Sequence, residues 1–322
     1  MRCLILTAGL GTRLRPLTFV RAKAAVPVNG EPIARRVIAW LVSQGLTDLV
    51  LNLHHRPESI AAVVGDGRDL GARVRYSWEN PVLGSAGGPR RALRLLVDPV
   101  APGAPEHPAF VIVNGDTLTA LALGAMIAAH QASGALVTMA LIPNPRPDLY
   151  GGVRVEGGWV TGFTRRGVTQ PSYHFIGVQV VNASVFAPLA DGVPAETVMQ
   201  LYPELIGSRG DAIAAHVVDA PFQDVGNPAE YLQTSLDLAG VEGDRLVSAV
   251  DVIIDPAARV SRTAIWNHVG IGARAALEDC IVCDGVQVPE GATYRRCAIA
   301  PNRGETLHED EYVEGDLVIR RF

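Results

Sequence analysis

The C-terminal part of the chain repeats every 17 residues, and this repeat restricts the fold more than any other feature of the sequence. Residues 254–270, 271–287 and 288–304 align as three rows without a gap. A 17-residue period is close to three hexapeptide units, so each row predicts one coil of a short three-sided β-helix. Side chains of one column would stack at the strand spacing of about 4.8 Å. The columns that hold similar residues are Ile254, Ile271 and Val288; Ala258, Ala275 and Ala292; Val260, Leu277 and Tyr294; and Ile265, Val282 and Ile299.

The repeat also accounts for two of the four cysteines. Cys280 and Cys297 share a column with Thr263, which predicts that both thiols are small buried fillers. A zinc site at Cys280 and Cys283 is disfavoured, because neither a second Cys-x-x-Cys pair nor a histidine at suitable spacing accompanies them. The four cysteines of the chain are too few and too unevenly spread for a secreted disulfide scaffold. Trp266 follows one apolar column, and the pattern leaves its direction open.

The first 150 residues alternate between apolar strands and helices, which is typical of a sheet of mostly parallel strands covered by helices. We therefore predict an α/β fold with a Rossmann-like, doubly wound mixed sheet. The expected strands are 3–7, 48–53, 73–78, 109–116 and 135–142, and the expected helices are 30–45, 57–64, 89–97 and 121–133.

Beyond residue 150 the pattern changes. It predicts a hairpin at 150–163, a strand at 174–181, a helix at 196–208 and a strand at 212–219. Asn227 is a candidate N-cap, and Pro228 occupies the first position of the helix that follows. We predict two domains, an α/β domain at 1–243 and a β-helix domain at 244–322.

Charge and hydropathy exclude several kinds of partner. With a formal net charge of −5, the chain has no overall attraction to nucleic acid or to an anionic membrane. The apolar N-terminal run is short and is followed at once by Arg13 and Arg15, which argues against a signal peptide. No stretch approaches the roughly 20 apolar residues that cross a bilayer. We therefore expect a cytoplasmic protein that binds neither nucleic acid nor membranes.

One segment carries residues that a hydrophobic core does not need. "TAGLGTRLRP", residues 7–16, follows the first predicted strand, at the end of the strand where open α/β sheets bind ligands. Gly9 and Gly11 allow the backbone to approach a phosphate. Thr12 supplies a hydroxyl, and Arg13 supplies a planar guanidinium that fits phosphate oxygens. The ending of a P-loop is absent, and a tight turn with exposed arginines is the structural alternative.

Five motifs, in order, resemble the signature of the sugar-1-phosphate nucleotidyltransferases, also called nucleotide-sugar pyrophosphorylases. The resemblance covers essentially the whole chain, and several members of this family carry a C-terminal β-helix, in agreement with the repeat. The motifs are LTAGLGTRLRPLT (6–18) followed by AKAAVPVNGEPI (22–33), LGSAGG (83–88), VNGDT (113–117), YGGV (150–153) and DVGNPAEYL (224–232).

The resemblance implies a GT-A-like catalytic domain, a left-handed β-helix and a Mg²⁺-dependent enzyme of EC 2.7.7 type. In such enzymes an oxygen of a sugar 1-phosphate attacks the α-phosphorus of a nucleoside triphosphate in line, and pyrophosphate leaves. Arg13 and Lys23 would hold the phosphates, and Asp116 and Asp224 would coordinate Mg²⁺. The resemblance also implies nucleotide contacts at Ala8, Gly9, Gly11, Thr12, Gly84, Ser85, Ala86 and Gly87, and sugar-phosphate contacts at Gly152, Arg166 and Gly177.

Several of these residues also have a structural interpretation. Asp116 would cap a turn, Asp224 would cap the helix after it, and Lys23 would be an ordinary surface lysine. Glu79 fits a surface charge as well as a sugar contact. The His54–His55 pair, at a strand end before a proline, favours a structural role.

The chain departs from the family pattern on the sugar side. FTRRG (163–167) stands where the family often has FxEKP, so Arg165 takes the place of the acid and Arg166 that of the lysine. Phe175-Ile176-Gly177 lacks an expected asparagine, and AKA replaces PKP around the lysine. These changes predict an unusual or relaxed acceptor, or a weakly active regulatory subunit that senses nucleotide sugars. The retained metal acids argue against the second, and a solvated arginine pair is the structural alternative.

Glycine-rich contacts do not identify the nucleobase or the sugar. GTP with mannose 1-phosphate is our first expectation, ahead of a uridylyl- or thymidylyltransferase for another hexose or amino-sugar 1-phosphate. An acyltransferase that uses the coil is disfavoured, because no plausible catalytic histidine besides His268 is present. The exposed rim of the predicted coil is a candidate surface for a homo-oligomer.

Overall fold

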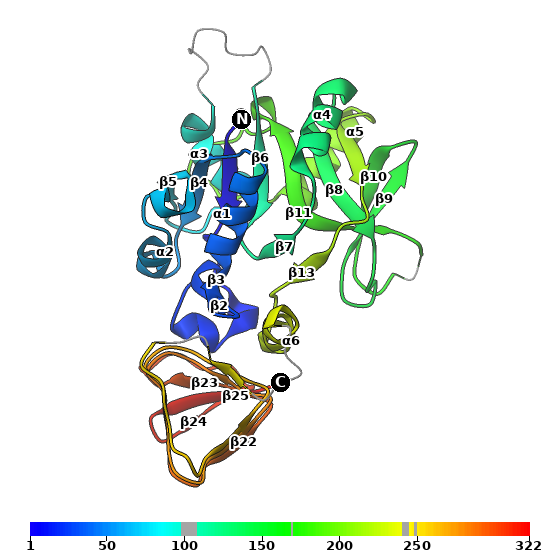
Figure 1. Cartoon of the computed structure of the whole chain (residues 1–322). Helices are drawn as coiled ribbons and strands as arrows, with labels where there is room; N and C mark the ends of the chain where they lie inside the picture. Colours follow the sequence, from blue (N-terminus) through cyan, green and yellow to red (C-terminus); the bar gives the residue numbers. More distant parts are fainter. Residues whose placement is uncertain (98–107, 169, 240–244, 248–249) are drawn as a thin grey trace. The chain divides into compact units, whose positions relative to one another are not determined.

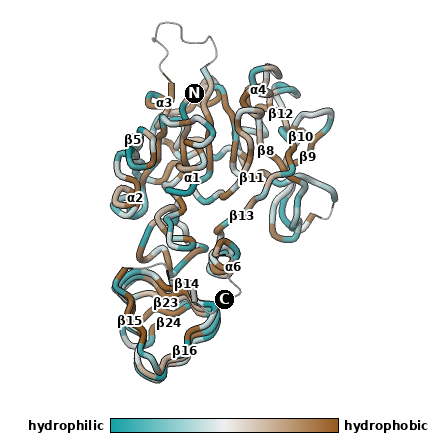
Figure 2. Tube along the Cα trace, in the orientation of Figure 1, coloured by the Kyte–Doolittle hydropathy of each residue, from teal (hydrophilic) through white to brown (hydrophobic). Residues whose placement is uncertain are grey.

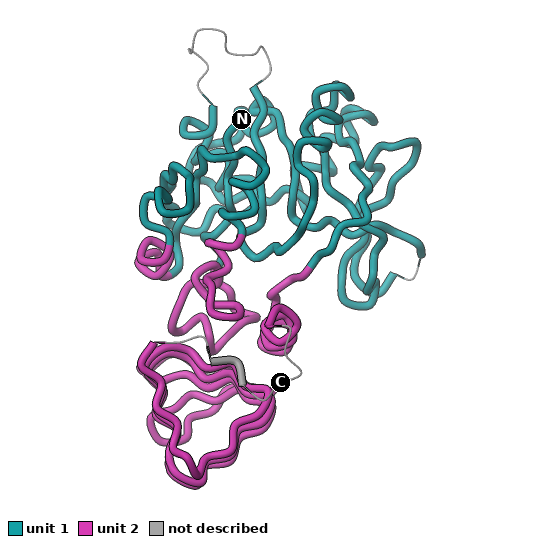
Figure 3. Tube along the Cα trace, viewed as in Figure 1, with its two compact units in different colours: residues 1–9, 37–55, 64–222 teal, residues 10–36, 56–63, 223–322 magenta. Residues whose placement is uncertain are grey.

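The computed structural model describes residues 1–97, 108–168, 170–239, 245–247 and 250–322. They form two compact units (Figure 3). Unit 1 comprises residues 1–9, 37–55 and 64–222, and unit 2 comprises residues 10–36, 56–63 and 223–322. Two N-terminal segments thus belong to the same unit as the C-terminal repeats. The predicted boundary between 1–243 and 244–322 falls on residues outside the described part and stays a prediction.

Unit 1 is built on a mixed sheet, which confirms the predicted α/β class (Figure 1). β5, β4, β1 and β6 run parallel, whereas β11 is antiparallel to both of its neighbours, β6 and β8. In sheet order, the nine described strands are β5 (Arg73–Trp78), β4 (Asp48–Leu53), β1 (Cys3–Leu6), β6 (Ala109–Asn114), β11 (Tyr173–Asn182), β8 (Val137–Pro143), β12 (Ile213–Val217), β10 (Trp159–Thr164) and β9 (Gly152–Glu156).

The central strands are continuous apolar runs because both of their faces are covered, as in parallel sheets generally. Leu4 of β1 lies between Val50 of β4 and Ile112 of β6, and all three side chains are fully buried. Figure 2 shows the same hydrophobic character along β8 and β11. The core of unit 1 therefore follows directly from the apolar strands that the sequence predicts.

The helices lie close to their predicted positions. α3 begins five residues earlier than expected, and the predicted helix at 196–208 opens with a π-helical segment at Thr197–Leu201. No helix within the described ranges combines the length and apolar character that a bilayer crossing needs. The helices of the first 222 residues are α1 (Ile33–Ser43), α2 (Pro57–Val64), α3 (Gly84–Leu96), α4 (Leu123–Ser133) and α5 (Tyr202–Ser208), and short 3₁₀ segments occur at Arg68–Leu70 and Ala183–Val185.

The strand order creates the kind of edge at which open α/β sheets bind ligands. From β1 the chain adds β4 and β5 on one side of the sheet and then returns to add β6 on the other side. The connections thus reverse direction between β1 and β6, and open α/β sheets bind ligands outside the carboxyl ends of the strands at such a point. Two of the predicted motifs lie here: the glycine-rich turn directly follows β1, and VNGDT spans the end of β6 and the turn after it.

The C-terminal repeats of unit 2 form three parallel sheets, which are the three sides of a triangular coil (Figure 1). Ile254 pairs with Ile271 and Ile271 with Val288, so the predicted 17-residue register is confirmed. The other apolar columns pair in the same way. The sheets consist of β14 (Arg245–Val247), β17 (Thr263–Ile265), β20 (Ile281–Val282) and β23 (Cys297–Pro301); β15 (Ile253–Ile254), β18 (Gly270–Ile271) and β21 (Gln287–Val288); and β16 (Arg259–Ser261), β19 (Ala276–Glu278) and β22 (Thr293–Arg295).

The corners of the coil recur with the same period. Arg262, Asp279 and Arg296 stand 17 residues apart, and each has a positive φ that reverses the chain direction. Cys280 and Cys297 are buried in the coil, which confirms their role as fillers. Burial raises the pKa of the Cys280 thiol to about 12, so this thiol stays protonated at neutral pH.

Trp266 lies against α6 (Pro228–Ala239). Its Nε1 donates to the Tyr231 hydroxyl at 2.8 Å, and that hydroxyl donates to the Pro27 carbonyl at 2.6 Å. Asn227 caps α6 as predicted, because its Oδ1 accepts the Glu230 amide at 3.0 Å. These bonds fix the direction of Trp266, which the sequence pattern leaves open.

Several short elements were not predicted. The main one is an antiparallel hairpin, β24 (Glu311–Glu314) and β25 (Leu317–Arg321), which extends the sheet of β23. The other short elements are 3₁₀ turns at Thr12–Leu14, Leu17–Phe19 and Lys23–Ala25 and the strands β2 (Pro27–Val28), β3 (Glu31–Pro32), β7 (Thr117–Thr119) and β13 (Phe222–Asp224).

Unit 1 contains a histidine whose protonation should weaken the fold. His174 lies between the rings of Tyr150 and Phe222, and burial lowers its pKa to about 4. The unfolded chain binds this proton near pH 6.5, so unfolding takes up a proton between about pH 6.5 and 4. As the pH is lowered through this window, we expect the free energy of unfolding to decrease. This decrease should be less steep in His174→Phe. Urea titrations at several pH values test this, and equal slopes in both proteins would contradict it.

Candidate active site

In unit 1, the ends of β1 and β6 are held together at the ligand-binding edge. The Gly115 amide donates to the Leu6 carbonyl at 2.9 Å, and a Cβ on Gly115 would stand 2.6 Å from that oxygen. Asp116 follows in the turn before β7, with a half-buried side chain. Gly9 is different, because no described atom lies within 4 Å of the place a Cβ would take. Packing within the described residues therefore does not require a glycine here, whereas the close approach of a ligand would.

A chain of buried hydrogen bonds connects the glycine-rich turn to the LGSAGG loop. The Asn52 Oδ1 accepts the Thr7 amide at 2.6 Å and the Ala8 amide at 3.3 Å. Its Nδ2 donates to Glu79 at 2.7 Å, and the same carboxylate accepts the Leu83 amide at 2.8 Å. Glu79 is only 3% exposed, so its interpretation as a surface charge is wrong.

Asn52 was not singled out from the sequence. The available signal was its position, because it is a polar residue near the end of the apolar run DLVLNL. A buried amide there needs partners for its donors and its acceptor. The neighbouring His54 has a structural contact, since its Nδ1 lies 3.0 Å from the Glu79 carbonyl oxygen.

The LGSAGG loop opens α3 and packs against residues 193–197 of unit 1. A Cβ on Gly84 would approach the Ala195 carbonyl oxygen to 2.7 Å, and one on Gly87 would approach that of Val193 to 2.6 Å. The Ser85 hydroxyl donates to the Glu196 carboxylate and accepts the Thr197 amide at 2.8 Å. Close packing therefore explains why both positions are glycine. Contacts of Gly84, Ser85, Ala86 and Gly87 with a nucleotide stay a prediction.

On the sugar side, the structure brings Gly177 next to VNGDT. Its φ is 78°, and a Cβ there would lie 2.6 Å from Thr117 Oγ1 and 2.7 Å from Asn114 Nδ2. The Gly152 amide donates to Thr164 Oγ1 at 3.1 Å, at the start of β9. Arg165 and Arg166 are exposed directly after β10. Gly177 therefore packs against the residues on either side of Asp116 in the VNGDT motif. The FTRRG arginines, by contrast, face solvent.

In unit 2, residues from two distant motifs gather around Gly226. The Lys23 Nζ lies 3.9 Å from Asp224 Oδ1, and their side chains are only 16% and 19% exposed. A Cβ on Gly226 would stand 3.2 Å from Asp224 Oδ2 and 3.6 Å from Arg13 Nη1. Glu230 accepts the Gly226 amide at 2.9 Å. The surface-lysine interpretation of Lys23 is therefore wrong, and so is the capping role for Asp224, because Asn227 caps the helix.

The segment that carries Arg13 is supported by the C-terminal hairpin. Arg320 Nη1 donates to the main-chain carbonyls of Arg13 at 3.0 Å and Arg15 at 2.9 Å. The Arg15 Nη2 lies 2.7 Å from Glu311 Oε2, in an ion pair whose side chains are 12% and 1% exposed. Gly11, with φ 63°, packs against Thr18 and Lys23 and starts the turn. Sequence reasoning missed this support, because nothing local marks residues 311 and 320 as partners of residues 13 and 15.

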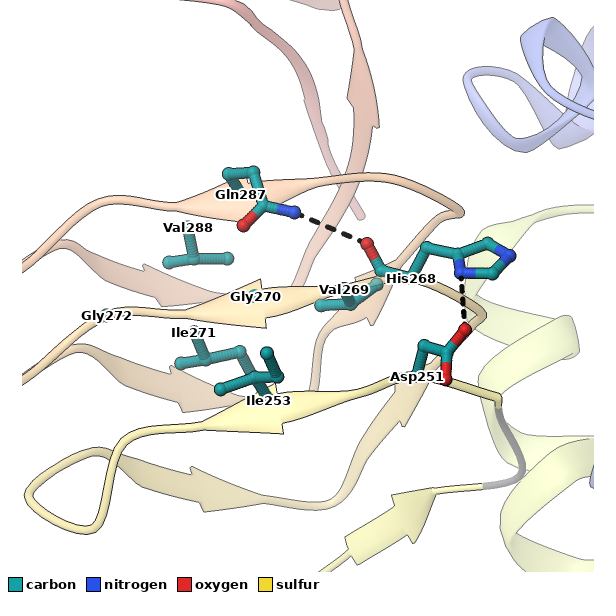
Figure 4. A pocket seen from close by; sticks show the side chains of 9 residues that line it. All are labelled: Asp251, Ile253, His268, Val269, Gly270, Ile271, Gly272, Gln287 and Val288. Carbon is teal, nitrogen blue, oxygen red and sulfur yellow. Dashed lines mark hydrogen bonds and ion pairs between the residues drawn. The ribbon is translucent and has the colours of Figure 1, made fainter.

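The described residues contain no group of three or more His, Cys, Asp or Glu side chains that could hold a metal ion alone. Asp116 belongs to unit 1 and Asp224 to unit 2, so their sharing of one ion stays a prediction. A groove of about 390 Å³ lies on the coil, and Figure 4 shows the residues that line it. There, His268 Nδ1 lies 3.3 Å from Asp251 Oδ2. None of the predicted site residues, all of which are described, lines this groove.

Comparison with known proteins agrees with the motifs. The profile described as "Nucleotidyl transferase" matches residues 2–240. The chain is 26% identical over 304 residues to the mannose-1-phosphate guanylyltransferase of Mycobacterium tuberculosis, covering 91% of this chain and 82% of that one. It is 24% identical over 336 residues to the UTP–glucose-1-phosphate uridylyltransferase of Synechocystis sp., covering 94% and 84%.

A solved structure has a similar fold. HddC from Yersinia pseudotuberculosis, in complex with GMP-PN, matches with a TM-score of 0.62 and 21% identity, covering 74% of this chain and 99% of that chain. The family profile covers the greater part of the sequence and includes every predicted site residue. The resemblance inferred from the five motifs is confirmed: the chain belongs to the nucleotidyl transferase family.

Proposed function

We propose that this protein joins a sugar 1-phosphate to a nucleoside triphosphate, with GTP and mannose 1-phosphate as the preferred pair. The observation that carries the proposal is the cluster of Arg13, Lys23 and Asp224 around Gly226. These residues come from two motifs about 200 positions apart, and the Glu230 carboxylate lies beside the same glycine. A fold without a ligand gains little from gathering two cations and two carboxylates in a partly buried cluster. Phosphates and a metal ion would balance these charges.

In this proposal the reaction is a single in-line displacement. A phosphate oxygen of the sugar 1-phosphate forms a bond to the α-phosphorus, and the bond from that phosphorus to the bridging oxygen of pyrophosphate breaks. Arg13 and Lys23 donate to the triphosphate and stabilise the negative charge that develops on the leaving pyrophosphate. The backbone at Gly9 and Gly11 lies close to the phosphates, and residues 84–87 contact the base and ribose. Catalysis then rests on alignment and charge stabilisation.

The donor set suits Mg²⁺. Asp116 and Asp224 offer hard carboxylate oxygens, and no third protein ligand of the usual kinds gathers with either of them in the described residues. Mg²⁺ is normally bound by one or two carboxylates together with water and substrate phosphates, so this sparse set fits the ion. When bound, it would neutralise phosphate charge and orient the α-phosphate.

The choice of GTP and mannose 1-phosphate is supported by the similarity to the guanylyltransferase of M. tuberculosis. A uridylyltransferase is the alternative, because the Synechocystis relative covers a similar share of the chain. We also infer that the triangular coil is left-handed, that its rim joins copies of the chain into a homo-oligomer, and that the protein acts in the cytoplasm. Size-exclusion chromatography with light scattering tests the oligomer.

A second function is favoured by one observation. Arg165 and Arg166 replace the acid and lysine of the sugar side and are exposed. If the acceptor site is thereby lost, the protein would bind nucleotide sugars as a weakly active regulatory subunit.

The first prediction concerns activity. With Mg²⁺, we expect pyrophosphate release for at least one pair of triphosphate and sugar 1-phosphate, with GTP and mannose 1-phosphate the fastest. Asp116→Asn should lower kcat by about a hundredfold or more, because it removes a charge that acts in the transition state. Asp191→Asn, an exposed aspartate of unit 1, is the control. Binding of nucleotide sugars without turnover of any pair would favour the regulatory function.

The second prediction concerns FTRRG. If Arg166 holds the sugar phosphate, Arg166→Ala should raise KM for the sugar 1-phosphate about tenfold, because an arginine–phosphate contact is lost. KM for the triphosphate should stay the same, and Arg166→Lys should recover part of the loss. Arg68→Ala removes another exposed arginine of unit 1 and serves as control. Unchanged KM values in Arg166→Ala would identify a solvated arginine pair.

The third prediction concerns the support of Arg13. Arg320→Gln loses two hydrogen bonds from a charged donor, each worth about 1.5 kcal/mol or more, and should loosen the segment that carries Arg13. We expect KM for the triphosphate to rise at least about tenfold, with partial recovery in Arg320→Lys. Arg274→Gln, on the exposed surface of the coil, is the control. A lower melting temperature without a change in KM would mean that Arg320 only stabilises the fold.

A further inference from the structure

A second cavity lies at the last coil of unit 2. It has a volume of about 800 Å³, within the range of small-molecule sites, which is about 300–1,000 Å³. β22, β23 and the β24–β25 hairpin line it, and the residues of the proposed active site do not. Its charged and aromatic lining consists of Arg295, Arg296, Glu314 and Arg321, and of Tyr294, Tyr312 and Phe322.

The charges of this cavity favour an anion. Three arginines line it against one glutamate, and Glu314 already accepts the Tyr294 hydroxyl at 3.1 Å. Arg295 is paired with Glu278, with Nε 3.3 Å from Oε2. For Arg296 and Arg321, by contrast, the described chain supplies no carboxylate within ion-pair distance. Two exposed guanidinium groups without a carboxylate partner are suited to bind the oxygens of a phosphate.

The aromatic side chains favour a ligand that also carries a planar ring. Tyr312 is 38% exposed beside the arginines, whereas Tyr294 is buried in the coil below it. A tyrosine face that is partly open to solvent offers a stacking surface for a nucleobase. Free phosphate would leave this surface unused.

We propose that this cavity binds a nucleoside phosphate, with Arg296 and Arg321 on the phosphate groups and Tyr312 against the base. The assignment does not depend on the proposed catalytic function, since it rests on the lining of the last coil alone.

The hairpin connects this cavity to the segment that carries Arg13. Successive side chains of a strand point to opposite faces. Glu311 and Arg320 are paired across β24 and β25, and from one face they hold Arg15 and the carbonyls of Arg13 and Arg15. Tyr312 and Arg321, the next residues along, line the cavity from the other face. We therefore expect a ligand in the cavity to change KM for the triphosphate. This effect on KM is the one expectation that rests on the proposed function.

Calorimetric titration of the full chain with GDP tests the site. We expect Arg321→Gln to bind one equivalent of GDP fewer than the wild type, or to bind that equivalent at least about tenfold more weakly. Arg321→Lys should recover part of the affinity. Arg274→Gln carries the same charge change on another part of the coil and should bind as the wild type does.

Equal stoichiometry and affinity in the wild type and Arg321→Gln would overturn the site. A titration with inorganic pyrophosphate separates the parts of the ligand. If pyrophosphate binds to the Arg321-dependent site as tightly as GDP does, the role of the base is overturned. If it binds at least about tenfold more weakly, that role is supported. Circular dichroism of each variant verifies the fold. The wild-type protein could also turn over its substrates without binding the Arg321-dependent equivalent of GDP. That result would overturn this inference and leave the proposed function intact.

Discussion

The parallel pairing of β1 with β6 determines which side chains meet at the edge of the unit 1 sheet. Leu6 pairs with Asn114, so the residues that follow both strands emerge side by side. Gly115 makes this possible, because any side chain there would collide with the Leu6 carbonyl. Residues 7–9 and Asp116 are thus brought to one place by backbone geometry, before any side-chain contact is considered.

Buried polar groups then extend this edge toward the LGSAGG loop. Asn52 and Glu79 lie at the ends of neighbouring strands, and their side chains are hydrogen-bonded to each other. Each side chain also accepts a hydrogen bond from a main-chain amide. A buried carboxylate is costly unless hydrogen bonds surround it. The loop is therefore held in one conformation without a ligand, which lowers the entropy that a bound nucleotide would have to overcome.

The sequence predicted the sheet, the helices and the coil because each depends on a local period. Apolar runs gave the strands of unit 1, and the 17-residue columns gave the register of the coil. Motif spacing also pointed to Lys23 and Asp224, although not to their contact. Glu79 was ambiguous because its burial depends on Asn52, 27 positions earlier. The hairpin and its hold on Arg13 escaped prediction, since they join residues about 300 positions apart and leave no local pattern.

That separation has a consequence for how the protein is made. Arg320 lies 307 positions after the carbonyl of Arg13 that it supports. During synthesis from the N-terminus, the glycine-rich turn emerges early, but its supporting arginine is added about 300 residues later. The sheet of unit 1 consists of segments that are complete well before then, and contacts between such distant residues form slowly. A chain on the ribosome would therefore already contain the whole described sheet while the segment that carries Arg13 still lacked the bonds that hold it in place.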